Sequence, residues 1–290
     1  AGKSSLYNAL TGGGALAAPY AFATKDPNIG VAKVPDERVD RLAVMSKTKT
    51  LVHAAVQVVD IGGLVEGASK GEGLGNKFLA NIRETHAIAH VVRCFENTDV
   101  VHVSGRIDPI HDIEVINTEL LLADYAAVEK AVEKAEKQAK AGKKEDVVRR
   151  DLLQKLRAHL DSGQPARTFP VPDEHRQAVD EMFLLTAKPV MYVANVDESG
   201  LGGNEFVDKV TAHAQQDGAE VVVVCAAIEA EIAQLDESDK LAFLEDLKLS
   251  EPGLNRVIRT GYRLLGLQTY FTVGPKEVRA WTVHAGDTAP

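Results

Sequence analysis

Hydrophobic residues follow two spacings along the chain. Valine-rich segments predict strands at about 54–60, 89–95, 189–195 and 220–226, and we expect these four to be neighbours in one sheet. Residues 77–90 and 205–216 carry apolar positions three and four apart, which is typical of helices. Continuous apolar strands fit a parallel sheet that is covered on both faces. The pattern therefore predicts an α/β fold with a mostly parallel, doubly wound sheet.

The spacing changes between residues 117 and 162. Apolar residues recur there at steps of four and three, the heptad spacing of a coiled coil, at Leu121, Tyr125, Val128, Val132, Ala135 and Ala139. After a break at 141–143 the apolar stripe resumes at Val148, Leu152, Leu156 and Leu160. We expect an antiparallel helical pair inserted into the α/β domain. The expected domains are 1–116 and 163–264 for the two α/β parts, 117–162 for the insertion, and 265–290 for a C-terminal segment.

Charge distinguishes the insertion from the rest of the chain. The 290 residues have a formal net charge of −9, which argues against a protein coated in nucleic acid. Residues 129–157 nevertheless hold ten Lys or Arg against six Asp or Glu. This basic arm is either a solvated helical face or a docking surface for a polyanion such as RNA.

Composition excludes some classes of protein. The sequence has no run of about 18 apolar residues, so we expect no membrane span and no membrane partner. Its two cysteines, Cys94 and Cys225, lie in apolar strand-like segments. Such cysteines are typical of buried, reduced thiols, and a cytoplasmic location is expected.

The first residues resemble half of a phosphate-binding loop. Gly2-Lys3-Ser4 matches the end of G-x-x-x-x-G-K-[ST], in which the lysine meets the β- and γ-phosphates and the hydroxyl binds Mg²⁺. The first glycine of that pattern would precede residue 1, so we expect the sequence to begin inside the loop. Residues 4–12 read as a helix that stops at glycines 12–14, and its start would point at the phosphates. Ala1 and Ser5 flank the motif and join the predicted nucleotide-binding residues.

The other parts of a nucleotide switch follow in order. A polar loop at 22–28 offers Thr24 as a second Mg²⁺ hydroxyl. The strand that ends at Asp60 continues as D-x-x-G, so that Asp60 is a candidate metal group and the N–H of Gly63 can meet the γ-phosphate. An ordered set of motifs is stronger evidence for a nucleotide site than Gly-Lys-Ser alone, and it predicts a real P-loop.

The base-reading motif departs from that of ordinary GTPases. Those proteins carry N-K-x-D after a late strand, and the aspartate accepts hydrogen bonds from guanine. Here the segment is Asn195-Val196-Asp197-Glu198, with valine in place of lysine and a longer acid in the fourth position. We expect a weakened guanine preference, with ATP accepted. The alternative is that Glu198 only caps the following loop.

Catalysis is expected to be slow. The position after Gly63, where glutamine often orients the attacking water, is Leu64, which forms no hydrogen bond with water. His102 is a candidate substitute, although a histidine between valines is typically a packed strand residue. The predicted catalytic set is therefore Lys3, Gly63, Leu64 and His102.

Several motifs together resemble one family. They are Asp60-Ile-Gly-Gly-Leu-Val, the glycine-rich 70–76, Arg93-Cys-Phe-Glu, Asn195-Val-Asp-Glu and Gln268-Thr-Tyr-Phe-Thr. The combination resembles the YchF subfamily of Obg-like P-loop ATPases over essentially the whole chain. That resemblance implies a G domain, an inserted coiled-coil domain and a C-terminal ubiquitin-like TGS domain. Only an opening hairpin of the TGS domain, turning at Gly274-Pro275, is expected within residues 265–290.

The resemblance also implies an activity and partners. It implies Mg²⁺-dependent hydrolysis of ATP at least as well as of GTP, and association with the large or small ribosomal subunit and its RNA, without sequence-specific DNA recognition. It assigns Lys3, Ser4 and Thr24 to phosphate and metal, residues 195–198 to the base, and Leu64 to the hydrophobic replacement of glutamine. Two alternatives stay open: a metabolic P-loop kinase, and a non-catalytic nucleotide-binding scaffold that acts through the coiled coil.

Overall fold

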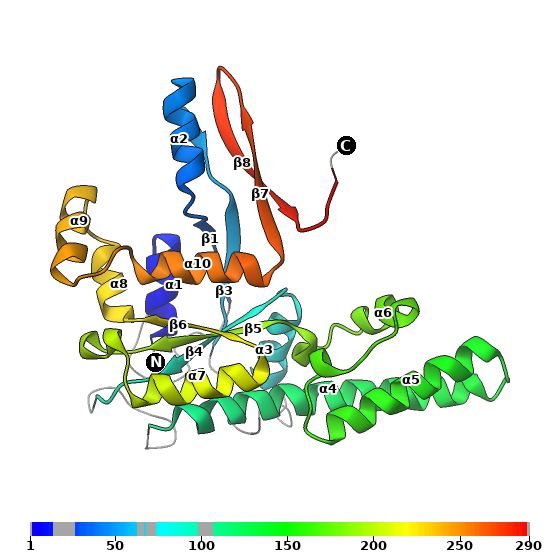
Figure 1. The fold of residues 1–290 in the computed structure, drawn as a ribbon. Coiled ribbons are helices and arrows are strands. Elements are labelled where there is room, and N and C mark those ends of the chain that lie inside the picture. The colour runs from blue at the N-terminus through cyan, green and yellow to red at the C-terminus, as the bar shows by residue number, and fades with distance from the viewer. Residues whose placement is uncertain (1, 14–26, 63–66, 68–73, 98–106, 289–290) are drawn as a thin grey trace. The chain divides into compact units, whose positions relative to one another are not determined.

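A computed structural model describes residues 2–13, 27–62, 67, 74–97 and 107–288 (Figure 1). The chain divides into two compact units. The first comprises residues 1–63, 89–110 and 190–290, and the second comprises residues 64–88 and 111–189. These bounds differ from the domain limits predicted above, which stay a prediction.

The first unit contains a three-stranded sheet in the order β4 (Ile88–Arg93), β5 (Val190–Asn195) and β6 (Glu220–Val224). β5 and β6 are parallel. β4 runs the same way, because backbone bonds join its two ends to β5 in the same direction, Ile88 to Pro189 at 3.0 Å and Cys94 to Asn195 at 2.8 Å. Helices α7 (Glu205–Asp217) and α10 (Gly253–Leu264) cover opposite faces of β5 and β6 (Figure 1). The double cover explains why apolar residues occupy both faces of these strands.

One sheet prediction is wrong for the described residues. β3 (Ala55–Asp60) does not join β4, β5 and β6 but pairs antiparallel with β1 (Asn28–Lys33) in a separate two-stranded sheet. Periodicity identifies a strand but does not specify its hydrogen-bonding neighbour, which depends on contacts between distant segments. The first of the four predicted strands is therefore a real strand that pairs with a different partner.

Helix α1 (Lys3–Thr11) packs between two sheets of this unit, the β1–β3 pair and the sheet of β4, β5 and β6. Its Leu6 is buried in the core formed by β5, β6 and α10. The helix ends at Gly12, which has a φ of 82°, as the glycine run predicted. On the other side of α1, Gly30 of β1 permits close approach, because an added Cβ would lie 2.6 Å from Thr11.

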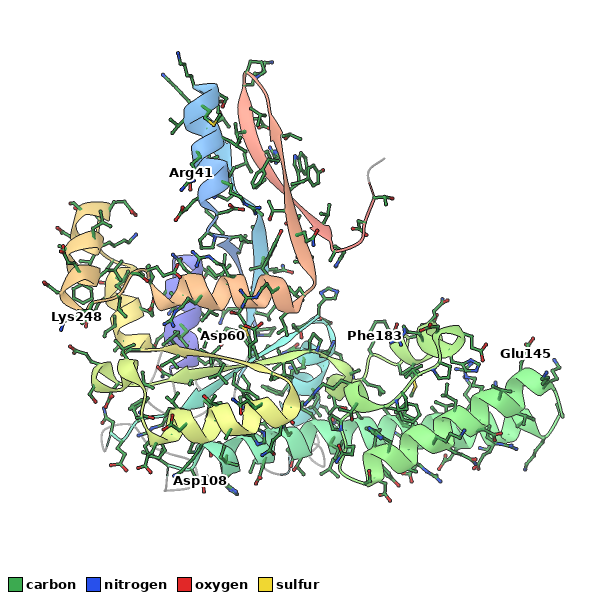
Figure 2. The ribbon with its side chains drawn as sticks, in the orientation of Figure 1. Arg41, Asp60, Asp108, Glu145, Phe183 and Lys248 are labelled. Carbon is green, nitrogen blue, oxygen red and sulfur yellow. The ribbon has the colours of Figure 1, made fainter. Side chains whose placement is uncertain are left out.

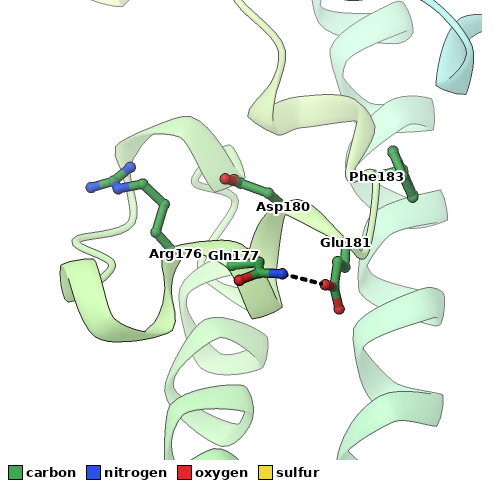
Figure 3. Close-up of a pocket in the computed structure, with 5 residues that line it drawn as sticks. All are labelled: Arg176, Gln177, Asp180, Glu181 and Phe183. Atoms are coloured by element: carbon green, nitrogen blue, oxygen red, sulfur yellow. Dashed lines mark hydrogen bonds between the residues drawn. The ribbon is translucent and has the colours of Figure 1, made fainter.

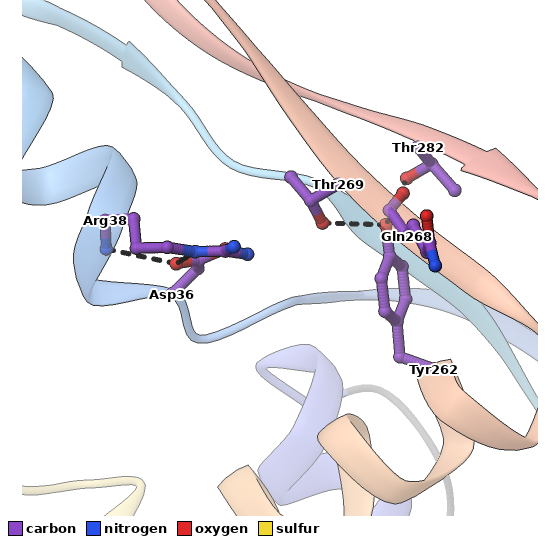
Figure 4. Close-up of polar contacts among 6 residues, drawn as sticks. All are labelled: Asp36, Arg38, Tyr262, Gln268, Thr269 and Thr282. Carbon is purple, nitrogen blue, oxygen red and sulfur yellow. Dashed lines mark hydrogen bonds and ion pairs between the residues drawn. The ribbon is translucent and has the colours of Figure 1, made fainter. Parts of the chain in front are cut away.

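The C-terminal hairpin has the predicted turn. β7 (Leu267–Val273) and β8 (Glu277–His284) are antiparallel, and β2 (Thr50–Val52) adds to β8 in parallel. Helix α2 (Glu37–Ser46) packs on the same three strands. The hydroxyl of Tyr262, on α10, bonds to the carbonyl of Gln268 at 2.9 Å and to the hydroxyls of Thr269 and Thr282 at 3.0 and 3.1 Å (Figure 4). The remaining helices of the unit are η3 (Glu198–Gly202), α8 (Ala226–Ile232) and α9 (Glu237–Asp246).

The second unit is built on a pair of long helices, α4 (Pro109–Ala139) and α5 (Lys144–Asp161). Val128, Val132 and Ala135 of the predicted seam pack in one core with Leu152, Leu156 and Leu160. Val148 is the exception, at 36% exposed. The shorter helices α3 (Leu74–Arg83), η1 (Ala166–Thr168), α6 (Asp173–Asp180) and η2 (Leu185–Ala187) complete the unit.

A buried acid joins α4 to the chain that follows the pair. Asp124, at 1% exposed, accepts hydrogen bonds from the N–H groups of Leu185 and Thr186 at 2.8 and 2.7 Å, and from the Thr186 hydroxyl at 2.6 Å. Burial raises the pKa of Asp124, and these three bonds oppose that shift. None of the described helices is long and apolar enough to cross a membrane.

Candidate nucleotide site

The start of α1 brings together three of the predicted site residues. Lys3 and Ser4 are the first residues of the helix, and burial of Leu6 and Tyr7 sets which side faces inward. The Ser4 hydroxyl donates to Oδ2 of Asp60 at 2.8 Å, and the Lys3 ammonium pairs with Oδ1 of the same carboxylate. Asp60, labelled in Figure 2, ends β3 and is 2% exposed. Asp60, which lies 56 positions after Ser4 in the sequence, therefore meets Lys3 and Ser4 at the start of α1, as the motif order predicted.

Lys3 lies in a partly dry environment. Burial lowers the pKa of Lys3 to about 8 from an ordinary value of 10.5, because the ammonium loses water. An adjacent carboxylate, here that of Asp60, favours the charged form of an ammonium group. Phosphate oxygens at the same place would favour the charged form in the same way. The group is therefore suited to a strongly anionic ligand.

The same residues fit a magnesium ion. Ser4 and Asp60 supply a hydroxyl and a carboxylate, the hard oxygen ligands that Mg²⁺ prefers. Within the described ranges, no group of three or more His, Cys, Asp or Glu side chains is placed to hold a metal ion. A metal at α1 would therefore depend on oxygens of its ligand as well as on this pair, which is the usual arrangement for Mg²⁺ with a nucleotide.

Asn195 connects the predicted base motif to the phosphate loop. Its side-chain oxygen accepts from the N–H of Ala226 at 2.9 Å, which ties the end of β5 to the start of α8. A Cβ added to Gly2 would lie 2.3 Å from the side-chain nitrogen of Asn195. The predicted base motif therefore contacts the predicted phosphate loop. Ala226 is not among the predicted site residues, because its contribution is a backbone N–H. Its only signal is its position directly after the strand β6 and Cys225.

The next three residues have different environments. Val196 is buried, at 2% exposed. Asp197 caps η3, accepting from the N–H of Gly200 and from the hydroxyl of Ser199, both at 2.9 Å. The alternative in which Glu198 acts as the loop cap is therefore wrong, because Asp197 fills that role. Glu198 is exposed and forms no hydrogen bond or ion pair with any residue that the structure describes.

Of the remaining predicted site residues, the structure describes only Ser5. Ser5 is the third residue of α1 and is half-buried. The rest of the predicted site falls outside the described residues, namely Ala1, Thr24, Gly63, Leu64 and His102.

A pocket in the second unit contains none of the predicted site residues. It is lined by residues of α6 and the turn after it, Arg176, Gln177, Asp180, Glu181 and Phe183 (Figure 3). Gln177 donates to Glu181 at 3.1 Å, and Phe183 is 63% exposed. The lining combines positive and negative side chains with one apolar ring. This mixture does not indicate a nucleotide-binding site.

Comparison with known proteins agrees with this geometry. A model of the 50S ribosome-binding GTPase family matches residues 1–119. The chain is 55% identical over 289 residues to the ribosome-binding ATPase YchF of Haemophilus influenzae, covering 100% of this chain and 80% of that protein. This chain belongs to the YchF family. A Bacillus subtilis YchF ribosome-binding ATPase is 49% identical over 292 residues, with the same coverage.

Solved structures support the assignment. The YchF GTPase of Schizosaccharomyces pombe superposes with a TM-score of 0.84 at 35% identity, covering 99% of this chain and 79% of that one. A GTP binding protein of Pyrococcus horikoshii superposes with a TM-score of 0.60 at 17% identity, covering 99% and 84% of the two chains, and shares the fold. The α/β P-loop GTPase fold predicted from the sequence is confirmed, and the chain is a YchF family member with that fold.

Proposed function

We propose that this YchF family member is a slow, Mg²⁺-dependent nucleoside-triphosphatase switch that hydrolyses ATP at least as well as GTP and binds ribosomes. The observation that carries the proposal is the meeting of Lys3 and Ser4 with Asp60 at the start of α1. The relatives named as ATPases and GTPases support hydrolysis of a nucleotide.

Each residue has a proposed role. Lys3 binds the β- and γ-phosphates, and the N–H groups at the start of α1 cradle them. Ser4, Asp60 and Thr24 hold the magnesium ion, which neutralises phosphate charge when bound. The N–H of Gly63 is proposed to meet the γ-phosphate. Leu64 leaves the attacking water without a hydrogen-bond partner, which makes hydrolysis slow unless His102 orients it.

Base selection is proposed to depend on residues 195–198. Asn195 is fixed by Ala226 and positions the segment, while Glu198 is exposed and available to a base. A carboxylate one methylene longer than aspartate fits the guanine edge poorly. Loss of a bidentate base contact costs about 1–3 kcal/mol, by analogy with side-chain readout of bases. That loss removes the guanine preference of an ordinary GTPase.

Ribosome binding is proposed from the names of the relatives, which are ribosome-binding ATPases. The α4–α5 pair forms the proposed coiled-coil arm, and the β7–β8 hairpin begins the proposed TGS domain. Lys143, Lys144 and Arg149 are exposed on the arm and suit contact with ribosomal RNA. A ribosomal partner fits a cytoplasmic location, and no sequence-specific contact with DNA is proposed.

Nucleotide binding tests the proposal. A fluorescent ATP analogue titrated into the protein with Mg²⁺ should bind, and Lys3→Ala should abolish binding. Lys209→Ala is the matched control, since Lys209 lies on α7, where it pairs with Glu205 and lies over the Phe206 ring. Ser4→Ala should weaken the dependence on Mg²⁺. Unchanged affinity in Lys3→Ala would remove the P-loop assignment, and failure of the native protein to bind would favour the scaffold alternative.

A further inference from the structure

The turn after α6 presents an aromatic ring to solvent. Phe183 is 63% exposed, the most exposed large apolar side chain in the described part of the second unit. Its two neighbours in the chain face inward, since Leu184 is buried in the core of the α4–α5 pair and Met182 packs against that core. A single exposed ring needs no explanation by itself. The backbone that carries Phe183 and the groups around it are more informative.

The backbone at Phe183 is left-handed. Its φ is 50°, a value that residues with a bulky side chain seldom adopt. The N–H of Phe183 donates to the carbonyl of Asp180 at 3.0 Å, which fixes the turn at the end of α6. Glycine is the usual residue with this conformation near a helix end, because it has no Cβ to be strained. Phe183 is strained and its ring stays largely exposed, so folding alone does not explain a phenylalanine here.

The ring belongs to the pocket described above, which α6 and the following turn form together (Figure 3). In the view of Figure 3, Arg176 and Phe183 lie at opposite ends, with the carboxylates of Asp180 and Glu181 between them. All four side chains are exposed. The pocket therefore places two acids beside an accessible aromatic ring.

The charge of this pocket is negative on balance. Residues 173–181 hold four Asp or Glu, and Arg176 is the one Lys or Arg among them. Arg176 already pairs with Asp173, at 3.6 Å. Glu181 accepts from a neutral side-chain amide at 3.1 Å, and the Asp180 carboxylate has no partner among the residues that the structure describes. The pocket therefore suits a cation.

We propose that this pocket docks an arginine-rich segment of a partner protein, in which a guanidinium stacks on the Phe183 ring and pairs with Asp180. Arginine combines both contacts, because its planar cation stacks on aromatic faces and fits a carboxylate. The same acids repel phosphate groups, so RNA is not the ligand of this pocket. The inference goes beyond the proposed function, since neither the nucleotide nor ribosomal RNA takes part in it.

A labelled peptide tests the contact with the ring. A fluorescein-labelled ten-residue peptide that alternates arginine and glycine should bind the native protein, measured by fluorescence anisotropy. The matching lysine peptide should bind more weakly, because an ammonium stacks less well. Phe183→Gly should weaken binding of the arginine peptide about 5- to 30-fold. Glycine suits the left-handed backbone, so this variant should melt at the native temperature or above it. Phe183→Tyr keeps the ring and should bind like the native protein.

A second pair of variants tests the charge. Asp180→Asn combined with Glu181→Gln should weaken binding of the arginine peptide and reduce its dependence on salt. Glu129→Gln combined with Glu133→Gln is the matched control, because it removes the same charge from exposed positions of α4 in the same unit. This control should bind the peptide like the native protein.

Four results would overturn the proposal. They are no binding of the arginine peptide by the native protein, equal affinity of Phe183→Gly, equal loss of affinity in the α4 control, and a lower melting temperature of Phe183→Gly, which would make the ring structural. Labelled oligouridine provides a separate measurement. Binding of oligouridine that is lost in Phe183→Gly would assign the pocket to RNA and would also contradict a protein partner.

Discussion

The side-chain oxygen of Asn195 accepts the N–H of Ala226 at 2.9 Å, and its side-chain nitrogen occupies the space that a Cβ on Gly2 would need. Three segments therefore meet at one asparagine: the end of β5, the start of α8 and the residue before α1. The asparagine of the predicted base motif therefore lies against the residue that precedes α1. Changes at Gly2 should act on nucleotide binding through this contact.

Replacement of Gly2 by alanine should reduce ATP affinity at least about tenfold, equivalent to about 1.4 kcal/mol. The new Cβ would lie 2.3 Å from Asn195, at a residue whose φ is 87°. Gly12→Ala is a matched control, because Gly12 also has a positive φ, of 82°, but no atom lies within 4 Å of an added Cβ. Gly12→Ala should lower stability by about 1 kcal/mol and leave ATP affinity unchanged. Equal ATP affinities of the two variants would contradict the proposed contact.

Shortening Glu198 to aspartate should shift preference toward GTP by roughly fivefold or more, since a guanine clamp needs the shorter acid. Competition between ATP and GTP for a fluorescent nucleotide measures the shift. Adding Val196→Lys completes the usual GTPase motif and should strengthen the shift, but Val196 is 2% exposed, so this second change should also lower stability. Glu205→Asp, at an exposed position of α7, should leave base choice unaltered. A native protein that already prefers GTP tenfold would refute this reading of the motif.

Charge reversal on the α4–α5 arm should weaken ribosome binding. Glutamate at Lys143, Lys144, Arg149 and Arg150 removes cations that are exposed or half-buried in the structure. Binding of the native protein should fall steeply with salt, and the variant should show a smaller slope. ATP hydrolysis should be largely retained. Co-sedimentation over a salt series measures both, with Lys209→Glu as the control. Binding that is independent of salt would indicate a protein partner for the arm.

Glu229 should make stability depend on pH. It is 2% exposed, and burial raises its pKa above the ordinary value of 4.5, although N–H groups of Gly253 and Leu254 at 2.7 and 3.3 Å oppose the shift. Above pH 4.5 the folded state retains a proton that the unfolded state has lost, so this contribution falls as pH rises through the raised pKa. Below pH 4.5 the contribution of Glu229 to stability is fully present.

Glu229→Gln should remove that contribution. The free energy of unfolding of Glu229→Gln minus that of the native protein should increase as pH rises from about 4 to about 7. Urea denaturation at each pH measures both values. Glu231→Gln, at an exposed position of the same helix α8, should show a constant difference. A constant difference for Glu229→Gln as well would show that burial does not perturb this carboxyl.

Much of the local structure was predictable. The glycine after α1 has the left-handed backbone that ends a helix, and heptad spacing identified the α4–α5 seam before its packing was known. Motif order predicts that Lys3, Ser4 and Asp60 share one site, and they lie together. Asn195 was assigned to the base, yet its oxygen bonds to a backbone N–H that carries no side-chain signal.

The sequence by itself determined the elements, the seam and the order of the nucleotide motifs, because hydrophobic period and capping chemistry act within a few residues. Only the tertiary structure decided the strand partners and the contacts between distant segments. β3 pairs with β1 because backbone hydrogen-bonding groups are the same in every strand and do not encode a neighbour. The rings of Tyr270 and Trp281, eleven positions apart in the chain, likewise stack only through the register of β7 with β8.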